Sequence, residues 1–295
     1  MLMKFFDLFL LFIHRTLPKK FLTKLFGKVA SCRGWPAYLL KHAFKFIYKI
    51  NMDEAAYKAL NLYPDLNELF TRRLDLQYRP QPIDSSVFSC PADGKLTQLG
   101  KIKNCSLIQA KGIKYTLTSL MAGDPELVKP FKQGGNFSCI YLAPHNYHRV
   151  HMPFDGELED ARYISGELFS VNKRTTASIQ NLYCQNERVI LLFRNKKLYF
   201  SIILVGACLV GGIAIVLPTL QGGSQTHIPG LQWGSEFRPT QAKSEILRGS
   251  EIGYFYFGST VILLTSTDGP NWLPSLEKNI LVRVGDPLTG ATSSG

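Results

Sequence analysis

The chain has 295 residues, of which 45% are hydrophobic and 19% charged, and its formal net charge is +12 at pH 7. This composition excludes a disordered polymer, and the length suits one large domain or two ordinary ones. Residues 1–50 contain ten Lys or Arg and one acid, a net of +9, which leaves +3 for residues 51–295. The basic character therefore belongs to the N-terminal segment.

The chain begins with "MLMKFFDLFLLFIHRTLP", which has some features of a signal peptide or membrane anchor. Its uninterrupted apolar run, Leu8 to Ile13, is far shorter than the roughly 20 residues that span a bilayer. No small-residue cleavage site follows, and basic residues do, so the pattern argues against secretion.

The next stretch, "KKFLTKLFGKV", predicts a helix that lies in a lipid interface. One helical face carries only apolar side chains and the other a row of lysines: Phe21, Leu22, Leu25, Phe26 and Val29 against Lys20, Lys24 and Lys28. Such a helix binds anionic headgroups, and "KHAFKFIYK" (41–49) continues the basic–aromatic alternation. A helix packed on the core is the alternative. Nucleic-acid binding is disfavoured because arginines are few.

Residues 51–75 read as helical, and residues 85–290 as a mainly β region in which short apolar runs alternate with Gly, Asn, Asp and Pro. The expected strands are "FSCIYLA" (137–143), "VILLFR" (189–194), "STVILLTS" (259–266) and "ILVRVGDPL" (280–288). The apolar stretch 198–217 fits either a transmembrane helix or two buried strands joined at a glycine-rich bend. From its residues alone these two interpretations stay open.

Six cysteines show neither a CxxC pair nor metal-ligand spacing: Cys32, Cys90, Cys105, Cys139, Cys184 and Cys208. The sequence therefore predicts a reducing compartment without disulfides. We also expect no metal site at "YLAPHNYHRVHMPFDG" (141–156), although His145, His148 and His151 recur there every three residues. The segment is short, bracketed by prolines and without an HExxH glutamate, so acid–base chemistry suits these histidines better.

Two further features could carry chemistry. Asp93 lies in "CPADGK" (90–95), in a turn between β-like segments. Ser259 follows Gly258 inside "YFYFGSTVILL" (254–264), which reads as a buried strand, and a glycine there marks a bulge or a close backbone approach. Asp93, a histidine and Ser259 supply the three groups of a nucleophilic triad, but the G-x-S-x-G elbow of an α/β-hydrolase is missing.

Together these motifs resemble the phosphatidylserine decarboxylase family over most of residues 60–265. The matching blocks follow the family's order: "LNELFTRRL", "PADGK", "YHRVHMPFDG", "ELFSVN", "NERV", "ILVGACLVGGI" and "GSEIGYFYFGSTVI". The usual Leu-Gly-Ser-Thr is here Phe-Gly-Ser-Thr, and "GACLVG" departs from the commoner version, but neither change removes a reactive group. The resemblance favours buried strands at 198–217.

The resemblance implies an α+β fold: N-terminal amphipathic helices in a membrane-association segment (1–50), then a mainly antiparallel β catalytic domain (51–295). It implies a carboxy-lyase zymogen that cuts itself between Gly258 and Ser259 into a large chain (1–258) and a small chain (259–295), which stay together as a heterodimer. His151, oriented by Asp93, would deprotonate Ser259, and Ser259 would become a covalent pyruvoyl cofactor.

In the second reaction that the resemblance implies, the amine of phosphatidylserine forms a Schiff base with the pyruvoyl group, CO2 leaves, and phosphatidylethanolamine results. His148 would lie near the substrate, and no metal takes part. The expected location is the cytoplasmic face of the cell membrane, as a peripheral protein of phospholipid biosynthesis. The resemblance leaves open whether copies of the chain associate into a homo-oligomer.

Three alternatives remain. A pyruvoyl enzyme could decarboxylate another amino-bearing substrate, although the basic and apolar N-terminus argues for a lipid. A serine hydrolase with an Asp93–His151–Ser259 triad predicts an intact chain. A membrane-binding module without activity leaves Asp93, His148, His151 and Ser259 unexplained.

Overall fold

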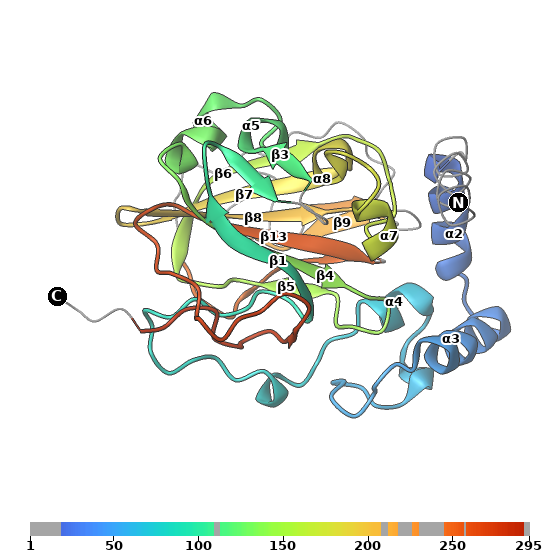
Figure 1. Cartoon of the computed structure of the whole chain (residues 1–295). Coiled ribbons are helices and arrows are strands. Elements are labelled where there is room, and N and C mark those ends of the chain that lie inside the picture. Colours follow the sequence, from blue (N-terminus) through green and yellow to red (C-terminus); the bar gives the residue numbers. More distant parts are fainter. Residues whose placement is uncertain are drawn as a thin grey trace.

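A computed structural model describes residues 19–108, 113–207, 212–217, 226–229, 245–256 and 258–291 (Figure 1). The apolar run Leu8–Ile13, the expected bend at 208–211 and most of the C-terminal tail lie outside these residues. The described chain combines helices with strands, and every pairing between two described strands is antiparallel. The expected α+β class with a mainly antiparallel sheet is thus confirmed.

Among the described residues, the helices are short except for α2 and α3 near the N-terminus. The α-helices are α2 (Lys19–Ala30), α3 (Trp35–Tyr48), α4 (Leu66–Phe70), α5 (Leu117–Leu120), α6 (Pro125–Val128), α7 (Lys173–Thr176) and α8 (Leu182–Gln185), and the 3-10 helices are η1 (Leu60–Leu62), η2 (Leu76–Tyr78) and η4 (Lys129–Phe131). Helix was expected throughout 51–75, but only η1 and α4 form there, because Pro64 interrupts the segment and Asp65 starts a new helix by capping the N–H of Glu68.

The largest sheet has eight strands in the order β11-β6-β7-β8-β13-β4-β1-β14. These strands are β1 (Gly94–Ile102), β4 (Gly135–Leu142), β6 (Gly156–Ile164), β7 (Arg188–Asn195), β8 (Leu198–Val205), β11 (Glu245–Ile246), β13 (Ser259–Thr265) and β14 (Leu281–Val282). The expected strands at 137–143, 189–194 and 259–266 are confirmed as β4, β7 and β13. The strand expected at 280–288 is wrong beyond β14, because the chain turns there at Gly285, whose φ is +91°.

A second sheet has the order β10-β9-β12-β5, and β2 pairs with β3 in a separate hairpin. These strands are β2 (Ser106–Ile108), β3 (Lys114–Thr116), β5 (Arg149–His151), β9 (Gly212–Ile215), β10 (Thr226–Pro229) and β12 (Glu251–Phe255). The expected buried strands at 198–217 are confirmed as β8 and β9. No helix among the described residues is long and apolar enough to span a membrane.

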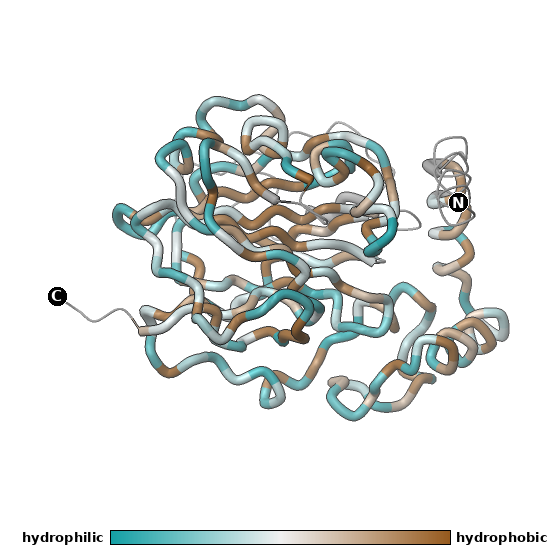
Figure 2. Tube along the Cα trace, in the orientation of Figure 1, coloured by the Kyte–Doolittle hydropathy of each residue, from teal (hydrophilic) through white to brown (hydrophobic). Residues whose placement is uncertain are grey.

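Both faces of the central strands are buried. One face packs with α4, α5 and α8 in a core that includes Ile203 and Ile262, and the other packs against the four-stranded sheet in a core that includes Leu204 and Val261. A strand covered on both faces has no solvent side, so its sequence shows continuous apolar residues instead of alternation. The continuous brown colour of the central strands in Figure 2 reflects this burial, which also explains why 198–217 looked like a membrane span.

"YFYFGSTVILL" is not one strand. β12 ends at Phe255 in the four-stranded sheet, and β13 starts at Ser259 in the eight-stranded sheet between β8 and β4. The chain therefore passes from one sheet to the other within three residues. Gly258 and Ser259 lie at this crossing, which explains a glycine inside an otherwise strand-like run.

Candidate active site

Ser259 is the first residue of β13, where it lies opposite Leu142 of β4. Its side chain is completely buried, and its Oγ has no hydrogen-bond partner. A buried hydroxyl without a partner is costly, so it indicates a reactive or ligand-binding group. The backbone at Gly258 is open, since a Cβ there would meet only the Leu142 carbonyl oxygen at 3.8 Å.

His148 lies close to this serine. Its Nε2–H donates to the Ala143 carbonyl at 3.1 Å, and its ring stacks on Phe70 of α4 with centroids 3.9 Å apart. Nδ1 is buried without a partner. Burial first, and then the positive charge of Arg72, lower the pKa of His148 to about 3. His148 is therefore uncharged at neutral pH and holds a bare lone pair on Nδ1.

The same short piece of backbone holds both groups. Ser259 pairs with Leu142, and His148 is anchored on Ala143, the next residue along the chain. The backbone N–H of Phe255, at the end of β12, donates to the carbonyl of His148 at 3.0 Å. The hydroxyl without an acceptor and the ring nitrogen without a donor thus belong to residues that are anchored on two adjoining positions, Leu142 and Ala143.

His151 is also buried, but both its ring nitrogens have other partners. Nδ1–H donates to the Gly249 carbonyl at 2.8 Å, and Nε2 accepts from the Tyr147 hydroxyl at 2.9 Å. Burial lowers its pKa. His151 lies opposite Glu251 in the β5–β12 pair. Glu251 precedes Phe255 by four residues, which corresponds to about 13 Å along β12. Among the described contacts, none joins His151 to Ser259.

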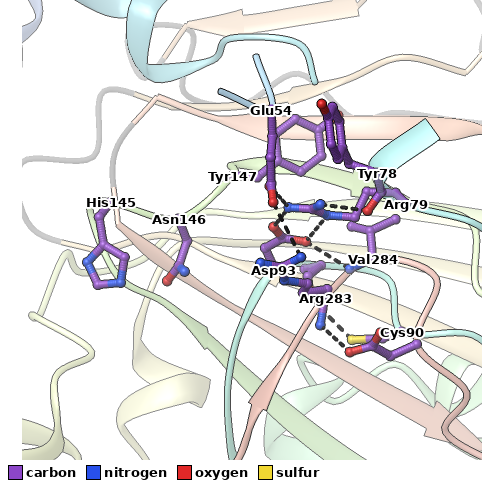
Figure 3. Close-up of polar contacts among 12 residues, drawn as sticks. Glu54, Tyr78, Arg79, Cys90, Asp93, His145, Asn146, Tyr147, Arg283 and Val284 are labelled. Atoms are coloured by element: carbon purple, nitrogen blue, oxygen red, sulfur yellow. Dashed lines mark hydrogen bonds and ion pairs between the residues drawn. The ribbon is translucent and has the colours of Figure 1, made fainter. Parts of the chain in front are cut away.

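Asp93 binds an arginine rather than a histidine. Arg79 Nε donates to Asp93 Oδ1 at 3.0 Å, Arg79 Nη2 donates to Oδ2, and the backbone N–H of Val284 donates to Oδ1 at 2.8 Å (Figure 3). Arg79 also pairs with Glu54, which in turn contacts Arg283. The described contacts include no hydrogen bond between Asp93 and His151. The charge of Asp93 nonetheless acts to raise the pKa of that histidine, against the larger effect of burial.

His145, the remaining histidine of the motif, is exposed. Its carbonyl accepts from Arg72 Nη2 at 3.2 Å. Within the part of the chain that the structure describes, no group of three or more His, Cys, Asp or Glu side chains could hold a metal ion.

The sequence patterns missed four residues of this site. Phe70 and Arg72 lie in "LNELFTRRL" and Tyr147 in the histidine motif, but nothing in the spacing showed that they contact the histidines. Arg79 lies in "QYRP" and carries no local signal at all. All four act through contacts between distant segments, which a single sequence does not show.

Two cavities lie near the site. The first, of about 320 Å³, is lined mainly by apolar side chains from α2, α3 and β4 and reaches Gly258. The second, of about 340 Å³, is lined by residues from 57–73 and by Arg149, Glu251 and Tyr254. The apolar cavity thus reaches the residue before Ser259, and the polar cavity reaches Arg72, whose charge acts on His148.

Comparisons with known proteins identify the family. Residues 66–290 match the phosphatidylserine decarboxylase family. Three relatives named phosphatidylserine decarboxylase proenzyme come from Ectopseudomonas mendocina, Idiomarina loihiensis and Coxiella burnetii, and they are 37%, 38% and 37% identical to this chain. The alignments cover 93%, 94% and 94% of this chain and 95%, 94% and 96% of the relatives. The chain therefore belongs to the phosphatidylserine decarboxylase family.

Proposed function

We propose that this chain is a phosphatidylserine decarboxylase, a carboxy-lyase that makes phosphatidylethanolamine and CO2 and depends on a pyruvoyl group formed from Ser259. Family membership supports the activity, and the relatives' name of proenzyme agrees with a processed chain. The observation that carries the proposal is the buried hydroxyl of Ser259, which follows a glycine and has no hydrogen-bond partner. These features fit a serine that reacts with its own backbone.

The first reaction is self-cleavage. Ser259 loses its hydroxyl proton, and Oγ attacks the carbonyl carbon of Gly258 while the peptide C–N bond breaks, which leaves an ester and a free amine on Ser259. Removal of the Ser259 α-proton expels the glycyl carboxylate. Water then converts the remaining enamine into the pyruvoyl ketone and ammonia. The products are residues 1–258 and 259–295, which the β13 pairing with β4 and β8 would hold together.

We assign the first proton transfer to His151 and the later proton handling to His148. Proximity favours His148, but a pKa of about 3 makes it a weak base. The pKa of His151 is also lowered, although the charges of Glu251 and Asp93 counteract this effect. His151 can accept the proton only when the Tyr147 hydroxyl leaves its Nε2 and a relay or a movement of the chain brings it within reach of Ser259. Asp93 and Arg79 would fix the backbone around this histidine.

When formed, the pyruvoyl group supplies a carbonyl that binds the substrate amine and takes up the electrons released as CO2 leaves. The residues around it provide a dry site in which His148 is uncharged. The Nδ1 lone pair of His148 can accept the proton that the substrate ammonium loses on binding and return it to the substrate carbon after CO2 leaves, and the stack on Phe70 fixes the ring for this transfer. Burial of His148 also excludes water.

A lipid substrate is supported by the apolar cavity. Phe26 of α2 and Leu40 and Ile47 of α3 line it, and it extends to Gly258. Helices α2 and α3 also leave large apolar side chains exposed: Phe21, Leu25, Val29, Trp35, Leu39 and Phe46. Together with the net charge of +9 in residues 1–50, this supports an amphipathic segment that holds the cavity at an anionic membrane surface, as in a peripheral protein of the cytoplasmic face.

The intact mass of the purified protein tests the proposal. We expect two fragments, the smaller starting with pyruvoyl in place of Ser259 and lacking a free amine. We further expect His151→Ala to remain a single chain, and His148→Ala to cleave but release no CO2 from phosphatidylserine. An intact wild-type chain labelled at Ser259 by a fluorophosphonate would instead identify a serine hydrolase. Cleavage with activity only on a soluble amino acid would contradict the lipid substrate.

A further inference from the structure

Arg72 is a buried cation that forms no ion pair with any carboxylate of the described residues. Only 3% of its surface is exposed, and its Nε and Nη1 groups have no hydrogen-bond partner. Nη2 alone is used, at 3.2 Å from the His145 carbonyl and 3.5 Å from the Asn146 carbonyl. An unpaired buried charge costs several kcal/mol, so a guanidinium held in this way indicates an anionic ligand.

The lining of the polar cavity that includes Arg72 has an excess of one positive charge. Its charged lining residues are three arginines and two glutamates: Arg72, Arg73, Arg149, Glu68 and Glu251. Arg149 is paired with Glu251 at 2.5 Å. Arg73 and Glu68 are both exposed. Arg72 is the buried member of this set that forms no ion pair with a described carboxylate, although the charges of Asp93 and Glu54 act on it from further away. Its free N–H groups suit the oxygens of a phosphate.

Arg72 also lies within one turn of the reacting residues. The N–H of Asn146 donates to the Ala143 carbonyl at 2.9 Å, which closes a β-turn whose end residues lie within about 7 Å. Ser259 and His148 are anchored at the start of this turn, through Leu142 and Ala143, and Arg72 at its end. In a serine phospholipid, four bonds separate the amine nitrogen from the phosphorus, so one headgroup can reach both ends.

We propose that Arg72 binds the phosphodiester of the substrate headgroup and thereby selects a phospholipid over other serine derivatives. This inference rests on the proposed function. The carboxylate is a poorer partner, because a cation bound to it would stabilise the ground state and lose its partner as CO2 departs. The phosphodiester keeps its charge throughout, so its bond to Arg72 contributes uniform binding, which lowers KM.

The test combines two proteins with two substrates. Arg72→Met and wild type are assayed for CO2 release from phosphatidylserine and from an O-alkyl serine of similar chain length, which lacks the phosphate, in the same detergent micelles. Wild type should prefer phosphatidylserine by about 10- to 100-fold in kcat/KM, the range of a charge-assisted hydrogen bond. Arg72→Met should lose this preference, mainly through a higher KM for phosphatidylserine, while any change on O-alkyl serine measures the effect of the lost charge on His148.

Arg73→Met is the matched control, because Arg73 adjoins the same cavity but is exposed, and it should keep the preference. An equal loss on both substrates would show that Arg72 only holds the His145–Asn146 backbone, and would overturn the proposal. Phosphatidylglycerol that activates wild type but not Arg72→Met would assign the site to a second lipid and also overturn it.

Self-cleavage should proceed in Arg72→Met, since the precursor reaction involves no phosphate. If the variant fails to fold, the kcat/KM values of the wild-type protein test the proposal by themselves. Equal values for the two substrates would exclude a phosphate-binding residue. Failure of this inference leaves cleavage and CO2 release from phosphatidylserine intact, whereas failure of the proposed function removes them.

Discussion

Asp93 and Arg79 form a bidentate ion pair that connects the Pro91–Gly94 turn to the segment after η2, with Arg79 Nε 3.0 Å from Asp93 Oδ1. The Arg79 side chain is 3% exposed and that of Asp93 9%. Because the Val284 N–H also donates to Asp93, the pair joins three distant segments of the chain. Its position next to His151 and Tyr147 makes it a structural support of the site.

Arg79→Met should therefore destabilise the protein strongly. Removing one partner leaves the Asp93 carboxylate buried without its cation, which costs about 3–5 kcal/mol in the free energy of unfolding. Urea unfolding in a Ser259→Ala background, where we expect one uncleaved chain, measures this change. Arg283→Met is the control: its side chain is 58% exposed and 3.3 Å from Glu54, so the loss should stay below about 1 kcal/mol. Equal losses of unfolding free energy in the two variants would show that the Arg79–Asp93 pair stabilises the protein no more than an exposed ion pair does.

Much of this architecture could be predicted from the sequence, but the contacts of the site could not. The runs at 189–194 and 259–266 mark strands because both faces of the central sheet are buried, and the family motifs point to Asp93, His148, His151 and Ser259. Those motifs do not say which side chains touch. The partners of Asp93 and His151 come from residues 79, 147, 249 and 284, whose places depend on tertiary packing.

The sequence pattern also did not show that the chain changes sheet between Phe255 and Ser259. Its residues have the aromatic and β-branched composition of one continuous strand, and both halves are in fact strands. What separates them is which neighbours each half pairs with, β9 and β5 for the first and β4 and β8 for the second. Pairing over such sequence distances leaves no local pattern.

Gly258→Ala tests the chemistry at this crossing without disturbing the fold. A Cβ at this position has room, so the free energy of unfolding should stay within about 0.5 kcal/mol of the parent. Self-cleavage should nonetheless slow by about 100-fold, because a Cβ beside the carbonyl displaces the attacking hydroxyl. Gel densitometry of the large and small fragments against time measures the rate. Cleavage at the wild-type rate would mean that glycine is not needed for the attack.

Gly135→Ala is the comparison for Gly258→Ala, because it should lower the stability of the protein. Its φ is +136°, and a Cβ there would lie 1.9 Å from the Thr265 carbonyl oxygen in the neighbouring strand β13. The backbone would have to separate, so this variant should be unstable whatever its chemistry. A stable Gly135→Ala would contradict the close β4–β13 approach.

The buried His148 should make stability depend on pH below neutrality. Its pKa is about 3 in the folded protein and about 6.5 in the unfolded chain, so below pH 6.5 only the unfolded state takes up the proton. The free energy of unfolding should therefore fall as the pH falls, by up to about 1.4 kcal/mol per pH unit from this residue. His148→Gln removes this contribution.

Urea unfolding of Ser259→Ala with and without His148→Gln, between pH 7 and pH 5, should thus give a smaller slope for the double variant. His145→Gln shows the effect of replacing an exposed histidine of the same motif. Identical slopes with and without His148 would mean that this ring becomes charged in the folded protein.

Helix α3 offers a direct test of membrane attachment. Trp35, Leu39 and Phe46 lie on one helical face, and Leu39 and Phe46 are 56% and 85% exposed. Leu39→Glu/Phe46→Glu should reduce binding to vesicles that contain phosphatidylglycerol by about 100-fold or more, because the two apolar side chains together gain about 3–6 kcal/mol when fully buried. The free energy of unfolding should hardly change, since both side chains face solvent in the folded protein.

Ile83→Glu is the matched control, because Ile83 is a fully exposed apolar residue outside the N-terminal helices. It should bind vesicles like wild type in a sedimentation assay. Raising the salt to about 0.5 M should weaken wild-type binding, since the basic residues of 1–50 are then screened from the anionic lipids. Equal binding of both variants, or binding that ignores salt, would place the membrane contact elsewhere on the chain.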